Sequence, residues 1–268
     1  MGNTVRASIG YSRRTDRKPF FYANAHEKDF VPLEPVEVEI ADARGRGCTL
    51  DREGFTLVEH CSSVADLTDL DAVKHVHSDE VAELLRTVSG CDHVAMTPMG
   101  ILRFSEKAGA NAAHDNSHPA RFVHVDMAGE AAAGMRQRTA PEGHDIVRSA
   151  QYNVWRVLSE PPQDVPLGLC AYDSLAPEDL IDCDAIFDPL DGSPEWGFPN
   201  YLLAHNPAHR WFYYADMHPG EALVFTTSES DPARAQMMPH GAFDNPLAPS
   251  DSPARISLEM RGTAYWFG

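Results

Sequence analysis

Alternation of apolar and polar residues predicts strands along most of this chain. Near the N-terminus Val36, Val38 and Ile40 alternate with acidic residues, as expected of a strand with one buried face. From about residue 94 onward the same kind of pattern recurs. The strand-like runs lie at 94–104, 121–127, 148–158, 168–172, 210–215, 221–227 and 254–266. Turn residues separate these runs without intervening helices, which favours a sandwich or a barrel.

A helical period is clear in one segment of the first third. Between residues 78 and 88 the apolar residues recur three or four positions apart and form one helix face. Ser78 is a candidate N-cap, and acidic residues follow it in the first turn. Gly90 interrupts the pattern and suits a C-cap. We therefore expect a helix over 78–88 that begins at Ser78.

The order of these elements indicates one domain over residues 1–268. Residues 1–93 are expected to form an α/β extension that packs on a β-rich core of residues 94–268. The segment 159–208 is rich in proline and aspartate. It predicts an extended insertion or lid, and a plain surface loop explains the same composition equally well. No internal repeat and no long linker divides the chain.

A candidate metal site arises from two segments that are far apart in the sequence. His124 and Asp126 lie two residues apart in a predicted strand, so their side chains project to the same face. His240 stands at the entrance to a turn and is a candidate for the third ligand. Two imidazoles and one carboxylate are the ligand set of a non-heme iron(II) site with open coordination positions. The H-x-D pair by itself is unspecific.

The last predicted strand has two chemically different faces. Its polar face carries Arg255, Ser257, Glu259 and Arg261, whereas Ile256, Leu258 and Met260 form the apolar face. A solvent-exposed sheet face would explain this pattern on its own. Its position just beyond His240 indicates a second role, because a guanidinium binds a carboxylate through two parallel hydrogen bonds. Arg255, with the hydroxyl of Ser257 as a second donor, is therefore a candidate anchor for 2-oxoglutarate.

Other histidines compete for a metal. Three pairs are close in sequence: His114 and His118, His205 and His209, and His75 and His77. The first two pairs have a spacing that suits zinc on a helix, but a proline follows the first pair and interrupts the second. The third pair lacks a suitable carboxylate nearby. We therefore expect all three pairs in surface or loop positions, with packing beside Arg210-Trp-Phe-Tyr-Tyr214 as an alternative for His209.

Composition excludes several classes of partner. The chain has 22 Lys and Arg against 40 Asp and Glu, which gives a formal charge of −18 and argues against a nucleic-acid partner. The five cysteines form no C-x-x-C pair, so neither a zinc ribbon nor a disulfide framework is expected. The N-terminus lacks the apolar core of a signal peptide, and no apolar stretch is long enough to span a bilayer. We expect a reduced cytoplasmic protein without a membrane partner.

The order of motifs along the chain resembles a known family. The segments that carry the resemblance, over nearly the full length, are Asp51-Arg-Glu-Gly-Phe55, Phe122-Val-His-Val-Asp126, Asn153-Val-Trp-Arg156, Pro166-Leu167, Asp173-Ser174, His209-Arg-Trp-Phe-Tyr213, Asp216-Met217, Pro239-His-Gly-Ala-Phe243 and Arg255-Ile-Ser-Leu-Glu-Met-Arg261. In this order they resemble the iron- and 2-oxoglutarate-dependent enzymes that include the cephamycin 7α-methoxylation component and the gibberellin desaturase-like hydroxylases and desaturases. Two positions depart from the family: Ile256 replaces an acidic residue, and Met127-Ala-Gly replaces Gln-Ser.

The resemblance implies a fold and a reaction class. The expected fold is mainly β with flanking helices around a double-stranded β-helix core, of the jelly-roll or cupin type. His124, Asp126 and His240 would hold Fe(II), with 2-oxoglutarate and O2 as co-substrates. The expected reaction is hydroxylation or desaturation of a small secondary-metabolite or amino-acid-like molecule, for example in antibiotic biosynthesis. Asp126 disfavours halogenation, because the iron halogenases of this superfamily lack that carboxylate.

The resemblance also implies roles for residues of the strand that follows the H-x-D pair. Asn153 is a candidate for co-substrate binding, and Trp155 and Arg156 are candidates for the substrate pocket. The alternative is that Trp155 belongs to the core and Arg156 pairs with a surface acid. Arg103, just upstream, is a further candidate for binding a substrate carboxylate.

Two other functions remain consistent with the sequence. One is a cupin-like isomerase or hydrolase that uses the same metal ligands without 2-oxoglutarate; in that case Arg255 would be dispensable. The other is an oxygenase-like partner subunit of a methyltransferase, as the cephamycin resemblance allows. A homodimer or a biosynthetic partner enzyme is therefore the kind of protein partner that we expect.

Overall fold

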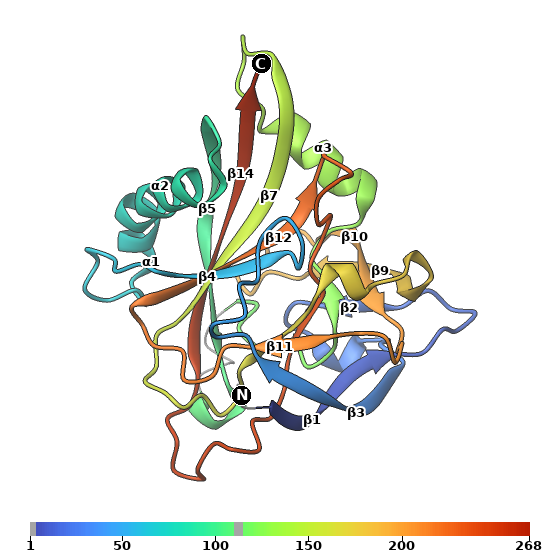
Figure 1. Cartoon of the computed structure of the whole chain (residues 1–268). Coiled ribbons are helices and arrows are strands. Elements are labelled where there is room, and N and C mark those ends of the chain that lie inside the picture. Colours follow the sequence, from blue (N-terminus) through green and yellow to red (C-terminus); the bar gives the residue numbers. More distant parts are fainter. Residues whose placement is uncertain (1–3, 110–114) are drawn as a thin grey trace.

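The computed structural model describes residues 4–109 and 115–268, and most of its regular structure is strand (Figure 1). The strands are β1 Thr4–Ser12, β2 Phe20–Tyr22, β3 Leu33–Asp42, β4 Phe55–Glu59, β5 His93–Phe104, β6 His124–Val125, β7 Ile146–Val157, β8 Leu167–Cys170, β9 Leu180–Phe187, β10 Trp196–Leu203, β11 Trp211–Tyr213, β12 Glu221–Glu229, β13 His240–Ala242 and β14 Ile256–Phe267. The α-helices are α1 Leu70–Ala72, α2 Ser78–Ser89 and α3 Gly129–Arg138. The described residues also form a π-helix, η2 Val73–His77, and the short 3-10 helices η1 His26–Lys28, η3 Glu106–Ala108, η5 Tyr172–Ser174 and η6 Pro177–Asp179.

The strands form two sheets. One has five strands in the order β4-β12-β7-β14-β5, and the other has nine in the order β1-β3-β11-β8-β13-β6-β10-β9-β2. The sheets face each other across a shared apolar core. In this core Phe55, Trp155 and Phe225 of the five-stranded sheet pack with Leu169 and Phe212 of the nine-stranded sheet. The mainly β architecture predicted from the alternation is confirmed.

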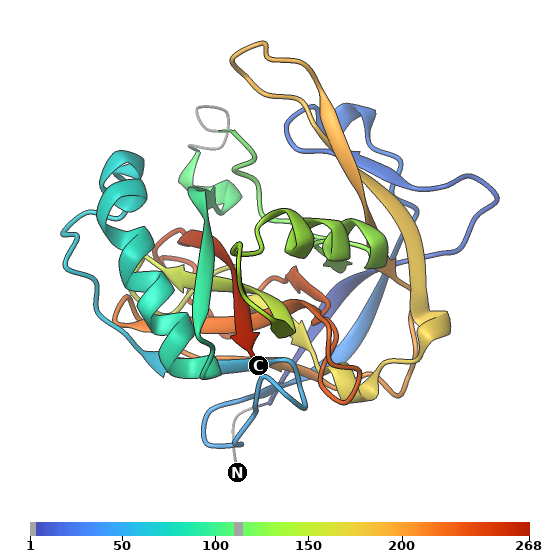
Figure 2. The same cartoon turned by 90° about the horizontal axis from the view of Figure 1, so that it is seen from above.

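Helix α2 covers the outer face of the five-stranded sheet, as Figure 2 shows. Its buried residues Val81 and Leu85 pack against Leu258 and Met260 of β14. The apolar face of this last strand therefore points outward, under the helix. Its polar face points into the space between the two sheets, where Ser257 and Glu259 are almost fully buried. A solvent-exposed face, the simpler explanation of the pattern, is excluded.

The predicted helix over 78–88 is confirmed as α2, Ser78–Ser89, but the helical segment that contains it begins earlier. The side chain of Asp69 accepts hydrogen bonds from the amides of Asp71 and Ala72 and caps α1, which continues through the π-helix η2 into α2. Ser78 is therefore inside a continuous helical segment and is not its N-cap. Gly90 ends α2 in the left-handed conformation, with φ of 69°, as predicted.

Other parts of the chain differ from the predicted organisation. Residues 1–93 supply β1, β2 and β3 to the nine-stranded sheet and β4 to the other, whereas an extension packed on the barrel was expected. The segment 159–208 contributes β8, β9 and β10 to the large sheet, although β9 and β10 also form a long projecting arm (Figure 2). An alanine-rich helix, α3, lies where no helix was predicted. Within the described residues no helix is long and apolar enough to span a membrane.

Candidate metal centre

His124, Asp126 and His240 converge at one point between the sheets. Strand β13 pairs with β6 so that His240 is directly opposite His124, and the two imidazole rings are 4.4 Å apart between centroids. The Nε2 atom of His124 lies 3.8 Å from Oδ1 of Asp126, and Nε2 of His240 lies 3.9 Å from Oδ2. One ligand atom from each residue lies within 4.8 Å of the others. This arrangement can hold a single metal ion.

Backbone carbonyl groups orient both imidazoles. Nδ1 of His124 lies 3.2 Å from the carbonyl oxygen of Phe122, and Nδ1 of His240 lies 3.2 Å from that of Met238. Each ring can therefore donate its Nδ1–H to a carbonyl, which leaves Nε2 unprotonated toward the centre. Burial, together with the nearby His240, lowers the pKa of His124 to about 3. The imidazole is thus neutral, as a metal ligand must be.

Two donors hold the carboxylate of Asp126. Nδ2 of Asn153 donates to Oδ2 at 2.7 Å, and Nη2 of Arg261 donates to Oδ1 at 3.0 Å. Arg261 also donates to Oε1 of Glu259 at 2.7 and 2.8 Å. Burial alone would raise the pKa of Asp126, but the charge of Arg261 is the largest opposing influence, and the pKa is held well below its usual range. The residue is therefore a carboxylate with a fixed orientation.

The side chain of Arg255 is buried inside the barrel. Only 1% of the residue is exposed, and within the described residues its Nε and Nη2 atoms make no hydrogen bond. The buried hydroxyl of Ser257, on the same strand face, also has no partner there. Burial, followed by the charge of Arg103, lowers the pKa of Arg255 to about 9. Arg255 and Ser257, the two residues predicted to bind 2-oxoglutarate, thus have hydrogen-bonding atoms inside the barrel without partners among the described residues.

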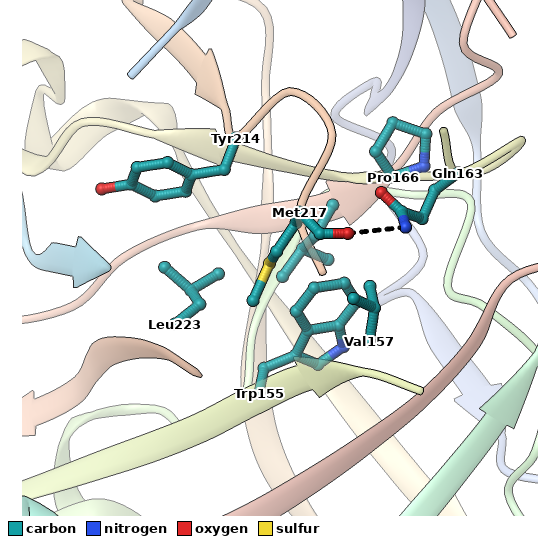
Figure 3. A pocket seen from close by; sticks show the side chains of 8 residues that line it. Trp155, Val157, Gln163, Pro166, Tyr214, Met217 and Leu223 are labelled. Carbon is teal, nitrogen blue, oxygen red and sulfur yellow. Dashed lines mark hydrogen bonds between the residues drawn. The ribbon is translucent and has the colours of Figure 1, made fainter. Parts of the chain in front are cut away.

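Trp155 lies beside Arg255 and lines a small cavity in the core. Its ring centroid lies 5.7 Å from the guanidinium carbon of Arg255. Figure 3 shows Trp155 facing Met217 and Leu223, with Gln163 donating a hydrogen bond of 2.8 Å to the carbonyl of Met217. The indole therefore supports Arg255 from the core side. This position matches the core alternative and differs from the predicted place in a substrate pocket.

Arg156 lies on the opposite face of β7 from Asn153, three residues away in the strand. Its Nη2 atom is 2.6 Å from Nδ1 of His60, and its Nη1 atom donates to the carbonyl of the same residue at 3.3 Å. The side chain is thus buried on the outer side of the five-stranded sheet. The prediction that Arg156 lines the substrate pocket is wrong, and so is the alternative of a surface ion pair.

Arg103 does face the interior. It is opposite Ser257 in the β5–β14 register and lines a pocket that also contacts His124. Its Nη1 atom donates to the carbonyl oxygens of Asn116 and His118 at 3.0 and 2.7 Å. The structure therefore brings this predicted residue close to the candidate metal ligands.

One of the competing histidines, His77, departs from the predicted surface or loop position. His77 and His209 have fully buried side chains, with Nδ1 of His77 2.8 Å from Glu80 and Nε2 of His209 3.0 Å from Asp179. The expectation of a surface or loop position is wrong for His77, which lies in a helical segment, whereas His209 lies in a loop, as expected, with its side chain packed. His75 is exposed as expected. His114 lies outside the described residues.

Sequence reasoning missed the role of Arg261 and Glu259. Both were recognised as members of the polar face of the last strand, but neither was assigned to the site. Their alternation with Ser257 was the available signal, since the same face that carries Arg255 also reaches Asp126. What the sequence could not supply was the distance from that face to the H-x-D segment.

Comparison with known proteins places the chain in a family. A family model described as oxidoreductase/YMDC permease-like domain matches residues 9–265. The chain is 30% identical over 240 residues to the alpha-ketoglutarate-dependent dioxygenase phiK of a fungal species, covering 85% of this chain and 83% of the relative. It is 29% identical over 241 residues to the Fe(II)/2-oxoglutarate-dependent dioxygenase nvfI of Aspergillus novofumigatus, with coverage of 85% and 82%. It is 27% identical over 253 residues to the hydroxylase/desaturase efuI of Hormonema carpetanum, with coverage of 87% and 84%.

Solved structures share the fold. The iron and alpha-ketoglutarate-dependent endoperoxidase NvfI superposes with a TM-score of 0.83 at 23% identity, over 99% of this chain and 98% of that one. A variant of the same endoperoxidase gives a TM-score of 0.82 at 23% identity, with full coverage of both chains. The predicted jelly-roll fold is confirmed by this similarity. The chain therefore belongs to the matched oxidoreductase family, and within it to the iron(II)- and 2-oxoglutarate-dependent dioxygenases.

Proposed function

We propose that His124, Asp126 and His240 bind one Fe(II) ion, and that Arg255 and Ser257 bind the distal carboxylate of 2-oxoglutarate. Two imidazoles and one carboxylate with open positions beside them are the donor set of non-heme iron oxygenases. The residues supply one negative charge to a divalent ion, which leaves room for an anionic co-substrate. The donor chemistry of this chain therefore fits both groups.

The observation that carries this proposal is that Nε and Nη2 of the buried Arg255 make no hydrogen bond with the described residues. A buried charge without hydrogen bonds is unfavourable by several kcal/mol on the order-of-magnitude scale of polar burial. A carboxylate can accept two parallel hydrogen bonds from this fork and a third from Ser257. The barrel thus holds donors that an added carboxylate would satisfy, and the ring of Trp155 lies 5.7 Å from the guanidinium carbon of Arg255.

The protein contributes orientation more than chemistry at this centre. When bound, Fe(II) with 2-oxoglutarate supplies the activation of O2 that no side chain can provide. The carbonyls of Phe122 and Met238 keep the two imidazoles turned inward. Asn153 and Arg261 keep the Asp126 carboxylate turned toward them. Asn153 therefore acts on a metal ligand, where the sequence had indicated direct binding of co-substrate.

We also propose the substrate range and setting that the sequence indicated. The substrate is a small secondary-metabolite or amino-acid-like molecule, and the reaction is hydroxylation or desaturation. Asp126 fills the carboxylate position, which disfavours halogenation. A cytoplasmic location and a homodimer or biosynthetic partner enzyme remain predictions, which cell fractionation and the mass of the purified protein in solution would test.

An anaerobic titration tests the site. Addition of Fe(II) and then 2-oxoglutarate to the protein is expected to produce a weak visible charge-transfer band, and His240→Ala is expected to abolish it. His75→Ala is the matched control, because His75 is exposed and distant from the site in sequence and structure. A full-strength band in His240→Ala would remove His240 from the site, and no band in the native protein at saturating ligand would refute the proposal.

A further inference from the structure

A pocket opens directly beside the candidate metal ligand His124. It lies between β2 with η1 on one side and the segment 116–124 on the other, and has a volume of about 250 Å³. The rings of Phe21 and Phe122 are 4.8 Å apart between centroids, and Phe122 is 5.6 Å from His124. The inner wall of the pocket is therefore aromatic where it meets the metal centre.

Arg103 supplies a cation to this aromatic pocket. Its Nη1 atom is committed to the carbonyls of Asn116 and His118 and to Oδ1 of Asn116. The Nε and Nη2 atoms make no hydrogen bond with described residues, and they are not sealed from solvent in the way that those of Arg255 are. No carboxylate within the described part of the chain forms an ion pair with Arg103. One edge of its guanidinium is thus free at the pocket.

The second arginine of the pocket is already neutralised. Arg121 forms ion pairs with Glu106 at 2.8 Å and with Asp244 at 2.9 Å. The two imidazoles of the pocket, His26 and His118, lie edge to face at 5.0 Å. Burial, followed by the nearby His26, lowers the pKa of His118, so this ring adds no charge at neutral pH. Of the two arginines that line the pocket, Arg103 is therefore the one that remains for a ligand.

We propose that this pocket binds the primary substrate, and that the substrate is an apolar organic molecule with a carboxylate group. The carboxylate accepts hydrogen bonds from Nε and Nη2 of Arg103, and the apolar body packs on Phe21 and Phe122. The metal centre adjoins the pocket at His124, so the body of the substrate is the part presented for oxidation. This inference rests on the proposed function, because the adjoining centre gives the pocket its purpose.

Binding of a matched pair of probes tests the carboxylate requirement. The probes are 2-naphthoic acid and methyl 2-naphthoate, whose two fused rings suit a pocket of about 250 Å³. Calorimetric titration is carried out on the protein loaded with Mn(II) and 2-oxoglutarate. The native protein is expected to bind the acid at least tenfold more tightly than the ester. Arg103→Gln is expected to lower the affinity for the acid at least tenfold and to leave the affinity for the ester within twofold of the native value.

The controls separate recognition of the carboxylate from a structural role. Arg6→Gln, on the exposed face of β1, is expected to leave both probes unchanged. Arg103→Lys keeps the charge without the fork and is expected to bind the acid with intermediate affinity. Equal loss of both probes in Arg103→Gln would show that Arg103 only anchors the 116–118 backbone, and would overturn the proposal. Failure of the native protein to prefer the acid would overturn it as well.

The co-substrate is followed in the same variants. In Arg103→Gln the anaerobic Fe(II)/2-oxoglutarate charge-transfer band is expected to persist, with the same half-saturating 2-oxoglutarate concentration as in the native protein. A weaker band with unchanged binding of the acid would assign Arg103 to 2-oxoglutarate and overturn the inference. Absence of the band in the native protein would refute the proposed function instead, while the preference for acid over ester could still be read. The two failures are therefore distinguishable.

Discussion

Arg261 donates a hydrogen bond of 3.0 Å to Asp126 while its guanidinium is bound to Glu259 at 2.7 and 2.8 Å. A cation beside a metal ligand would repel the metal if it stood alone. Glu259 neutralises it, so the pair fixes the carboxylate with little net charge. Asn153 holds the other oxygen of the same carboxylate. Both oxygens of Asp126 are thus oriented from the five-stranded sheet, opposite the sheet that carries the histidines.

Removal of this contact is expected to weaken metal binding. Arg261→Gln loses the donor to Asp126 and leaves Glu259 without its partner. Substitutions of groups that orient metal ligands typically lower metal affinity by about 10- to 100-fold, and we expect a loss at the lower end, since Asn153 still holds the carboxylate. Calorimetric titration with Mn(II) measures the effect.

A double variant tests how the opposite charges of Arg261 and Glu259 contribute to metal binding. The double variant Arg261→Gln/Glu259→Gln removes one positive and one negative charge together. If orientation is the main contribution, the double variant is expected to lose as much Mn(II) affinity as Arg261→Gln. Tighter binding than native in either variant would show that repulsion by Arg261 outweighs its orienting effect.

Substitution of Arg255 is expected to affect 2-oxoglutarate and not the metal. Arg255→Lys keeps a cation but cannot reproduce the planar fork, and burial of the shorter ammonium favours its neutral form. We expect the half-saturating 2-oxoglutarate concentration of the charge-transfer band to rise by about 100-fold, which corresponds to about 3 kcal/mol, with unchanged Mn(II) affinity. Arg6→Lys serves as the exposed control. An unchanged 2-oxoglutarate titration in Arg255→Lys would favour a metalloenzyme that does not use this co-substrate.

The alternation of residues along single strands correctly predicted which side chains share a strand face. The period of two in the last strand correctly separated the residues that face α2 from those that face the metal centre. The same reasoning placed His124 and Asp126 on one face, although β6 is only two residues long. The strand pairing that brings His240 opposite His124 was not predictable from either segment, because it depends on the order of strands in a nine-stranded sheet.

Errors in the sequence analysis arose where burial reversed the usual preference of a residue. Arg156 and His77 are polar, and the expectation for such residues is exposure. Both are buried together with His60 between the outer sheet face and α2. The 159–208 segment was misjudged for a related reason, since its prolines and aspartates mask the strand alternation of β9 and β10.

A substitution of Arg156 tests whether this residue lines the substrate pocket, as the sequence analysis predicted. Its side chain lies on the face of β7 away from Asn153, and it contacts His60. We therefore expect Arg156→Met to leave the affinities for Mn(II), 2-oxoglutarate and substrate within about twofold of the native values, since sites that share no partners act nearly independently. Calorimetric titrations of the three ligands measure this. A selective loss of substrate binding, with the other two affinities unchanged, would return Arg156 to the substrate pocket.

His77 is expected to make stability depend on pH between about 5 and 7. Its buried ring has a pKa lowered from 6.5 to about 4, chiefly by burial. Between these values the unfolded chain binds a proton that the folded protein does not, so stability is complete above about pH 6.5 and falls as the pH decreases. At pH 5 the loss is about 2 kcal/mol, from about 1.4 kcal/mol per pH unit.

Urea denaturation at about pH 7.5 and about pH 5 measures this dependence. His77→Leu removes the titrating ring. Between the two pH values its free energy of unfolding is expected to fall by about 2 kcal/mol less than that of the native protein. Glu80, which bonds to His77, has a pKa lowered from 4.5 to about 2 and therefore acts only below this pH window. The lowered pKa of His60 contributes in both proteins and cancels in the comparison. An equal pH effect in both proteins would contradict the assignment to His77.

Gly10 of β1 is expected to control the position of the segment that carries His124. A Cβ atom at Gly10 would lie 2.2 Å from the carbonyl oxygen of Arg121, and Gly10 also accepts a hydrogen bond of 2.9 Å from Val123. Gly10→Ala must displace the backbone just before the metal ligand, with a loss of stability of about 1–3 kcal/mol and weaker Mn(II) binding. Gly129→Ala is the matched control, because its Cβ would meet nothing closer than 3.7 Å. Urea denaturation and Mn(II) titration of both variants measure the effects, and native behaviour of Gly10→Ala would show that the close approach of β1 is not required.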